Sequence, residues 1–157
     1  MQARLDYAQA SPEATKAMYA LQGYVNKCSI EHSLQELVKI RASQINGCAF
    51  CLDMHTKDAR SQGETEQRIY LLNAWREAPF YTPRERAALA WTEAVTMIRE
   101  GVSDEVFAEV REQFNDKELA DLTLVVTAIN AWNRVAISFH TVPGSYQPAK
   151  RVAAAAV

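Results

Sequence analysis

Two helices joined by a short break are predicted by residues 33–55, which read SLQELVKIRASQINGCAFCLDMH. Ser33, followed three residues later by Glu36, fits a capping box at the start of the first helix. Five residues then recur at helical spacing along one stripe: Leu34, Leu37, Val38, Arg41 and Ile45. Asn46-Gly47 ends this pattern, because glycine is favoured just beyond a helix end and asparagine is favoured as the cap of the next helix.

The second of these helices carries the side chains with the most chemistry. We expect it to be capped by Asn46 and to end at Gly63. Cys48 and Cys51 enclose two residues, and His55 follows four positions after Cys51. The offsets i, i+3 and i+7 place the three side chains on one helix face. Two thiols and an imidazole near the positive end of a helix indicate a thiol redox site.

Helical signals recur along the rest of the chain, whereas strand signals do not. Cap residues and apolar stripes predict further helices over residues 12–25, 64–73, 83–100, 103–110 and 117–139. The residues expected to cap four of them are Ser11, Thr82, Ser103 and Asp116. In the last helix apolar residues occur nearly all round the axis, at Leu119, Leu122, Leu124, Val125, Val126 and Ile129. We therefore predict an all-α fold, a compact bundle in which the last helix is buried and the cysteine pair begins a central helix.

Length and composition favour one soluble, cytoplasmic domain. The 157 residues suit a single core, so residues 1–157 are expected to form one domain, with 143–157 as a C-terminal tail on the surface. The formal charge of −2 gives no reason to expect nucleic acid or an anionic membrane as a partner. We find no secretory signal at the N-terminus and expect no apolar segment of the roughly 18 residues that span a bilayer.

A cytoplasmic location bears on the three cysteines, Cys28, Cys48 and Cys51. Reducing compartments rarely keep structural disulfides, so the paired thiols are expected to be catalytic or metal-binding. A helix N-terminus stabilises a thiolate, and His55, at i+4 from Cys51, can take its proton or stabilise the thiolate as imidazolium. Cys48 lies one turn away, close enough to convert a sulfenic acid on Cys51 into a disulfide.

Three other roles for this group stay open from the residues alone. The pair can exchange disulfides or sense redox state without turning over peroxide. The two cysteines and His55 can also supply three zinc ligands, with Cys28, Asp53 or Glu36 as a fourth. Two buried thiols beside a core histidine are the inert alternative.

The spacing Glu36-x11-Cys48-x2-Cys51-x3-His55, preceded by residues 43–47, resembles the core motif of the alkylhydroperoxidase D family, within the carboxymuconolactone decarboxylase-like superfamily. The segment from Asn130 to Arg134 is also similar to the smaller members. The resemblance implies an all-helical protein, assembled as a homotrimer or homohexamer, that reduces organic hydroperoxides without a cofactor. The decarboxylase branch lacks the cysteine pair, so the resemblance favours peroxide over lactone chemistry.

The same resemblance implies a role for each motif residue. Cys51 would be the peroxidatic thiol and Cys48 its resolving partner, while His55 and Glu36 would relay protons. The founding enzyme of the family has a histidine inside the bracket, where this chain has Phe50. The resemblance thus predicts a thiol-dependent antioxidant peroxidase acting on organic or hydrogen peroxide. Its reductant would be an external dithiol, either a lipoyl carrier or a thioredoxin-like protein.

The remaining polar and aromatic candidates have expected structural roles. Glu36 also fits the capping box of Ser33, and the two roles are compatible if another element buries its carboxylate. Arg41 and Arg134 lie on apolar stripes, where each is expected to pair with a carboxylate. Five others are expected in turns, at a helix end, in the core or at a subunit interface: His32, His140, Trp75, Trp91 and Trp132.

Overall fold

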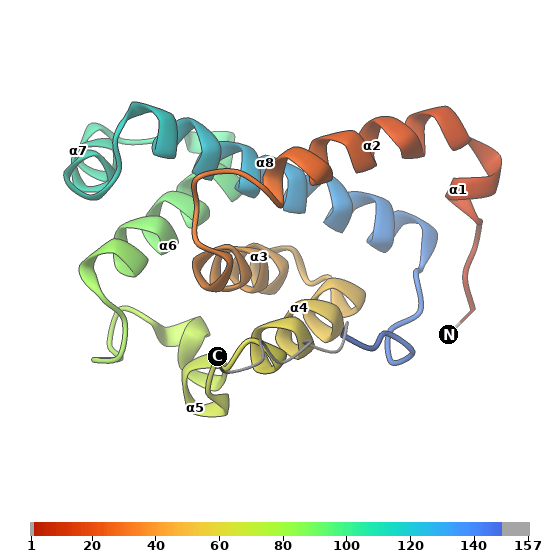
Figure 1. The fold of residues 1–157 in the computed structure, drawn as a ribbon, viewed down its shortest axis with the longest axis horizontal. Helices are drawn as coiled ribbons and strands as arrows, with labels where there is room; N and C mark the ends of the chain where they lie inside the picture. Colours follow the sequence, from red (N-terminus) through yellow and green to blue (C-terminus); the bar gives the residue numbers. More distant parts are fainter. Residues whose placement is uncertain (1, 149–157) are drawn as a thin grey trace, which may run out of the picture.

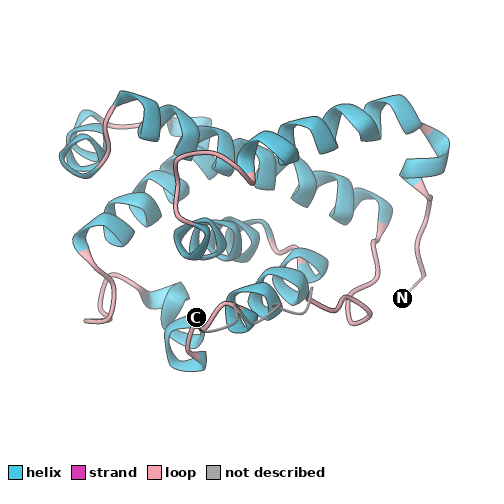
Figure 2. Cartoon of the chain, viewed as in Figure 1, coloured by secondary structure: helices cyan, strands magenta, loops and turns pink. Residues whose placement is uncertain are grey.

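The computed structural model describes residues 2–148, and within them every regular element is helical (Figures 1 and 2). The α-helices are α1 (Tyr7–Ala10), α2 (Pro12–Val25), α3 (His32–Asn46), α4 (Ala49–Ser61), α5 (Glu66–Leu71), α6 (Pro83–Thr96), α7 (Asp104–Gln113) and α8 (Asp116–Phe139). Short 3-10 helices follow α5 and α6, at Leu72–Ala74 and Ile98–Glu100. The all-α prediction is therefore confirmed.

Helix α3 lies at the centre of the bundle and packs against α4, α6 and α8 (Figure 1). Helices α2 and α8 form a layer on one side of it, while α4 covers the opposite side (Figure 1). The largest core cluster joins α2, α3, α6, α7 and α8, and includes the fully buried Phe114 and Leu122. A second cluster joins α3 with the α5–α6 region around Leu37 and Trp75. These two cores fix α3, and α3 in turn supports the start of α4.

Several predicted helix ends are confirmed. The Thr82 side chain accepts from the backbone N–H of Glu85, whose carboxylate accepts in return from the N–H of Thr82, so a capping box opens α6. Ser103 caps α7 through its hydroxyl. Gly47 ends α3 in the left-handed conformation, at φ 70°, which only glycine adopts readily.

Two other predicted caps, Ser33 and Asp116, are wrong by one or two residues. Helix α3 begins at His32, so Ser33 already lies in its first turn and forms no capping box with Glu36. Helix α8 is capped by Asn115, because its amide oxygen accepts from the N–H of Glu118. For helix α2 the predicted cap position, Ser11, is confirmed, although its hydroxyl makes no capping hydrogen bond. The sequence pattern placed these helices correctly. It did not decide which of several neighbouring polar residues caps each helix.

Helix α8 is the long apolar helix that the sequence predicted, with two differences. Nine of its residues are buried, whereas Leu124 is 37 % exposed and faces outward. An 18-residue window of the helix reaches a mean hydropathy of 1.3, so by length and composition alone it qualifies as a membrane span. The expectation that no segment would be long and apolar enough to span a bilayer was therefore wrong. In this bundle the helix packs against α2, α3, α4, α6 and α7.

The chain beyond α8 turns back toward α4 (Figure 1). The backbone N–H of Gly144 donates to Asp53 (2.9 Å), and Lys57 Nζ donates to the carbonyl of Tyr146 (3.0 Å). The hydroxyl of Tyr146 donates to Asp58 Oδ1 (2.7 Å). The described part of the predicted tail, residues 143–148, is thus bonded to one helix, and residues 149–157 lie outside the described part of the chain.

Candidate active site

The first turn of α4 is organised by Cys48 itself. Cys48 has the extended backbone of an N-cap, and its sulfur accepts from the backbone N–H of Cys51 at 3.4 Å. Asn46, predicted to cap this helix, instead ends α3, and its side chain donates to Asn130 and Asn133 of α8. The thiol therefore takes the position of the oxygen that usually caps a helix, where the unpaired N–H groups favour negative charge.

Both thiols of the pair are buried and free. Cys48 is 1 % and Cys51 2 % exposed, in a small apolar cluster with Ala42 of α3 and with Ile129 and Ala136 of α8. The inner faces of three helices thus enclose the pair. This burial leaves the sulfurs little contact with bulk water and strengthens the charge interactions they make.

The two thiols share a proton unequally. A hydrogen bond from the thiol of Cys51 lowers the pKa of Cys48, burial opposes this, and the N–H of Cys51 adds to the lowering, so that the pKa reaches about 7. The same hydrogen bond, together with burial and the neighbouring charge, raises the pKa of Cys51 well above its usual range. The first proton is therefore lost from the pair near neutral pH, and the charge resides mainly on Cys48.

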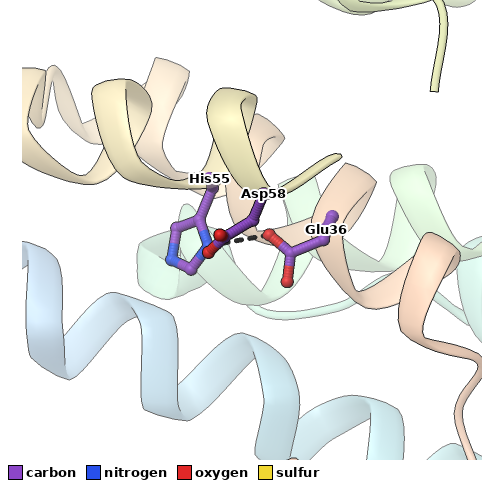
Figure 3. A group of neighbouring side chains, drawn as sticks. All are labelled: Glu36, His55 and Asp58. Atoms are coloured by element: carbon purple, nitrogen blue, oxygen red, sulfur yellow. Dashed lines mark hydrogen bonds and ion pairs between the residues drawn. The ribbon is translucent and has the colours of Figure 1, made fainter. Parts of the chain in front are cut away.

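His55 lies one turn further along α4 and meets Glu36 from α3 (Figure 3). Its Nδ1 lies 2.8 Å from Glu36 Oε2, and both side chains are buried. Lys39 donates to the other oxygen, Glu36 Oε1, at 2.8 Å. Burial acts to raise the pKa of Glu36, but the hydrogen bond and charge of His55, followed by those of Lys39, hold it below its usual value. Glu36 is therefore a carboxylate that orients the imidazole.

Asp58 and Tyr146 join this group, although neither was predicted as a site residue. A carboxylate oxygen of Asp58, a ring nitrogen of His55 and a carboxylate oxygen of Glu36 lie within 4.8 Å of one another (Figure 3). Tyr146 donates to Asp58, and burial followed by this carboxylate raises the pKa of Tyr146 to about 12. Asp58 was detectable in principle, because it lies at i+3 from His55 on the same face. No pattern in the sequence around Tyr146 indicated that this residue would reach the site.

A cavity of about 630 Å³ opens onto these groups. Among the described residues, Cys51, His55 and Glu36 line it, whereas Cys48 does not. Aromatic side chains cover another part of its wall, and they include Phe50 from inside the CxxC and Trp132 from α8. A molecule that enters this cavity meets one thiol, Cys51, together with the carboxylate–imidazole pair.

Three of the four predicted site residues, Cys51, His55 and Glu36, thus line one cavity, and Cys48 lies in the same buried cluster as Cys51. The donor atoms that cluster within 4.8 Å in the described chain come from Glu36, His55 and Asp58, and no cysteine is among them. This grouping differs from the set of two cysteines and one histidine considered for zinc. Lys39 and Tyr146 already donate to the two carboxylates, which fits a hydrogen-bonded relay.

The arginines and lesser candidates lie elsewhere. Arg41 pairs with the buried Glu93 at 2.8 Å, as expected for its stripe. Among residues 2–148, Arg134 bonds to the backbone and side-chain oxygens of Asn130 and not to a carboxylate.

Cys28 is half-buried beside Gln35. The positions of four other candidates are as follows: His32 lines the cavity, His140 ends α8 in the left-handed conformation, and Trp75 and Trp91 are buried in the two main cores.

A buried CxxC at a helix start, backed by a carboxylate–histidine pair in an all-α bundle, defines a class of helical dithiol proteins. A sequence profile of the carboxymuconolactone decarboxylase family matches residues 12–94, and the chain belongs to this family. It is 48 % identical over 139 residues to the uncharacterized protein YdfG of Bacillus subtilis, covering 88 % of this chain and 95 % of that protein.

Solved structures show the same fold. A crystal structure from Agrobacterium tumefaciens superimposes with a TM-score of 0.89 at 47 % identity, covering 92 % of this chain and all of that one. It is described as a protein of unknown function and a candidate antioxidant defence protein AhpD. An uncharacterized peroxidase-related protein from Ralstonia eutropha, described as an alkylhydroperoxidase AhpD core, superimposes with a TM-score of 0.78 at 20 % identity over 88 % of this chain and 75 % of its own. The fold is therefore that of alkylhydroperoxidase D-like proteins.

Proposed function

We propose that this protein is a thiol-dependent peroxidase that reduces organic or hydrogen peroxide through the pair Cys48 and Cys51. The observation that carries the proposal is that Cys51 lines the same cavity as the buried Glu36–His55 pair. The thiolate that forms near neutral pH is one proton transfer away from Cys51, across the hydrogen bond between the two sulfurs. The family and the antioxidant description of the Agrobacterium relative support this chemistry.

The reaction has two steps at the protein. When the shared proton moves to Cys48, the thiolate of Cys51 attacks one peroxide oxygen, the O–O bond breaks, and the alkoxide that leaves takes up a proton. Cys51 is then a sulfenic acid. The sulfur of Cys48, as thiolate, attacks the sulfur of Cys51 and displaces hydroxide, which is protonated to water as the disulfide forms. An external dithiol supplies two electrons and two protons to restore both thiols.

The Glu36–His55 pair supplies the proton that the alkoxide needs. With Nδ1 donating to the carboxylate of Glu36, the imidazole presents Nε2 for proton exchange. The pair is buried and lines the same cavity as Cys51, so it can deliver a proton where the peroxide reacts. General acid catalysis of this kind contributes typically about 10²- to 10⁴-fold in rate.

The partners follow from this cycle and from the family. The reductant we propose is a dithiol, either a lipoyl-bearing carrier or a thioredoxin-like protein, and the assembly a homotrimer or homohexamer. Cys51 is only 2 % exposed, so a reductant must reach the disulfide through the cavity. A flexible lipoyl arm fits such an approach better than a flat protein surface.

The test is peroxide consumption with dihydrolipoamide as reductant. We expect Cys51→Ser to lose turnover and Cys48→Ser to stop after one turnover, with a sulfenic acid on Cys51 that dimedone traps. Cys28→Ser is the matched control, because Cys28 lies outside the cavity wall, and it should retain wild-type turnover. Wild-type turnover by Cys51→Ser would overturn the proposal.

A second substitution tests the relay. Glu36→Gln removes the carboxylate that orients His55, and kcat/KM should fall by about 100-fold. Glu93→Gln is the control for losing a buried carboxylate, because Glu93 bonds to Arg41 and Trp75 and lies outside the cavity wall. The control should lower the melting temperature and leave kcat/KM of the folded protein near the wild-type value. Equal kcat/KM in the two variants would remove Glu36 from the mechanism.

Disulfide exchange without peroxide turnover is the second candidate. The lowered pKa of Cys48 at a helix N-cap favours it, because reactive dithiol pairs carry their low-pKa cysteine in that position. A negligible rate with peroxide, combined with rapid reduction of the Cys48–Cys51 disulfide by a dithiol, would select this activity instead. The burial of Cys48 at 1 % exposure opposes direct attack by a protein partner.

A further inference from the structure

A second cavity, of about 210 Å³, lies between the N-terminal segment, α2 and the C-terminal half of α8. Helices α1 and α2 lie beside that part of α8 (Figure 1). The backbone N–H of Arg4 donates to the carbonyl of Phe139 at 2.9 Å, and the ring of Phe139 stacks on that of Tyr7 with 6.0 Å between centroids. These contacts hold the N-terminal segment against the end of α8, so that Leu5 and Tyr7 form part of the cavity wall. We call this space the apolar pocket.

The wall of the apolar pocket offers little to a polar ligand. Its larger members include Leu5, Met18 and Val135, and none of the described residues that line it carries a charged side chain. The hydroxyl of Thr15 also lines the pocket, but it already donates to the carbonyl of Ser11 at 3.0 Å. A charged group that entered would lose its hydration without gaining a partner of opposite charge. The pocket therefore favours a hydrocarbon group.

The size of the apolar pocket suits part of a small organic molecule. An engineered apolar cavity of about 150 Å³ in another protein binds benzene. The pocket described here is larger, at about 210 Å³, and has room for an aromatic ring or a short alkyl chain.

The apolar pocket adjoins the cavity that contains Cys51. Tyr7 and Trp132 line both spaces, so their side chains form the boundary between them. Trp132 is held there by α2, because its Nε1–H donates to Gln22 Oε1 at 3.1 Å and its ring packs on Tyr19 with 5.3 Å between centroids. A molecule that extends across this boundary has the thiol and the carboxylate–imidazole pair at one end and hydrocarbon side chains at the other.

We propose that the apolar pocket binds the hydrocarbon tail of an organic hydroperoxide whose O–O group lies at Cys51. This role rests on the peroxidase function proposed above and gives the substrate class as hydroperoxides with an extended alkyl or aryl-alkyl tail. Reacting groups in one space and an uncharged, apolar wall in the next match a single amphipathic occupant. Burial of each methylene group strengthens binding about fourfold, so the pocket favours such substrates over hydrogen peroxide.

The first experiment detects the bound tail without any peroxide. The probe is 1-octanol, which carries a hydroxyl where octyl hydroperoxide carries its hydroperoxyl group, and tert-butanol is the control without a long tail. NMR of [methyl-¹³C]methionine reports the position of the probe, because Met18 lines the apolar pocket and Met54 lines the cavity of Cys51. Met97 is 55 % exposed and lines neither space.

We expect 1-octanol to shift the methyl signals of Met18 and Met54 with one common dissociation constant, and to leave that of Met97 in place. The same concentration of tert-butanol should leave the signal of Met18 in place, because this molecule has no tail to reach the pocket.

The second experiment fills the apolar pocket. Ala14 is exposed and lines the pocket, so Ala14→Trp places an indole in it. Ala20→Trp is the matched control, because Ala20 is exposed on the opposite face of α2 and does not line the pocket. The dissociation constant of 1-octanol should rise about tenfold in Ala14→Trp and stay within about twofold in Ala20→Trp. If Ala14→Trp does not fold, Ala10→Trp fills the same pocket from α1.

Turnover with dihydrolipoamide as reductant gives the corresponding change in selectivity. The ratio of kcat/KM for octyl hydroperoxide to kcat/KM for tert-butyl hydroperoxide should fall about tenfold in Ala14→Trp and keep its wild-type value in Ala20→Trp.

The outcomes distinguish this pocket from the peroxidase function itself. A shift of Met18 by 1-octanol that Ala14→Trp weakens would support the tail pocket even if the wild-type protein turned over no peroxide. Saturating 1-octanol without a shift of Met18, or equal weakening by the two tryptophan variants, overturns the proposal whatever the peroxidase activity. A changed oligomeric state of Ala14→Trp in analytical ultracentrifugation, with wild-type selectivity for octyl hydroperoxide, would identify a subunit contact and overturn it as well.

Discussion

The two thiols of the CxxC have different surroundings although they lie one helical turn apart. The sulfur of Cys48 accepts from the backbone N–H of Cys51, and the neighbouring thiol of Cys51 together with this N–H lowers the pKa of Cys48, so Cys48 holds the charge of the deprotonated pair. Cys51 faces the cavity, so it meets the substrate. The position of His55 at i+4 had predicted both properties for Cys51. In the structure, His55 Nδ1 bonds to Glu36 of α3. The interaction between the two thiols decides whether Cys48 or Cys51 carries the negative charge.

This arrangement predicts how alkylation depends on pH. The pKa of Cys48 is lowered to about 7, so the thiolate is absent well below that pH and forms as the pH rises through it. In a Cys28→Ser background, the rate of labelling by iodoacetamide should therefore rise through a midpoint near 7. In Cys48→Ser, burial still raises the pKa of Cys51, and labelling should rise only above about 8.5, the value of a free thiol. Labelling rates of the two proteins between pH 5 and 10 check this, and coincident midpoints would contradict it.

At the level of helices, the positions of the long elements were predictable, whereas their ends were predicted only in part. Apolar stripes placed α3, α6 and α8 correctly, because burial of one face decides which segments form helices, and cap, proline and glycine signals placed α2 and α4. The caps depend on single hydrogen bonds between neighbouring polar residues, for which the chain offers several candidates. At α4 the cap is Cys48, a residue that cap preferences rank low, because Asn46 is held by α8. That tertiary contact had no trace in the local sequence.

The glycine between α3 and α4 gives a test at this scale. Gly47 has φ 70°, and a Cβ atom added there would meet no heavy atom within 4 Å, so a side chain at this position encounters backbone strain alone. Gly47→Ala should lower the free energy of unfolding by about 1 kcal/mol. Gly23 lies in helix α2 with the same open space, and Gly23→Ala should raise it by about 0.5–1 kcal/mol. Urea unfolding of both variants measures the difference, and a shift of the same sign in both would contradict it.

Across the whole molecule, the cavity is built from segments far apart in the chain. Its wall takes residues from α1, α2, α3, α4 and α8, and from the segment after α8. The spacing of Glu36, Cys48, Cys51 and His55 could be predicted because a single helix pair carries all four. Trp132 and Tyr146 could not, since Trp132 reaches the site only through packing of α8 against α2, and Tyr146 only through packing of the segment beyond α8 against α4. The family spacing therefore identified the candidate reacting groups, and the fold adds the residues that enclose them.

The enclosing role of Tyr146 gives the last prediction. Tyr146 lines the cavity, and its hydroxyl bonds to Asp58, so this one residue of the segment 143–148 contributes to the wall next to the candidate reacting groups. Tyr146→Ala removes this part of the wall and should raise KM for cumene hydroperoxide about tenfold, the effect of about 1.4 kcal/mol of lost apolar contact. It should leave KM for hydrogen peroxide nearly unchanged, because this molecule is too small to contact the Tyr146 side chain.

Tyr146→Phe keeps the ring, and its KM should stay within about threefold of wild type for both peroxides, because it loses one partly buried hydrogen bond. Tyr70→Ala is the control, since Tyr70 is 69 % exposed and lies outside the cavity wall. Equal changes of KM for the two peroxides in Tyr146→Ala would show that the segment supports the fold and does not contact the substrate.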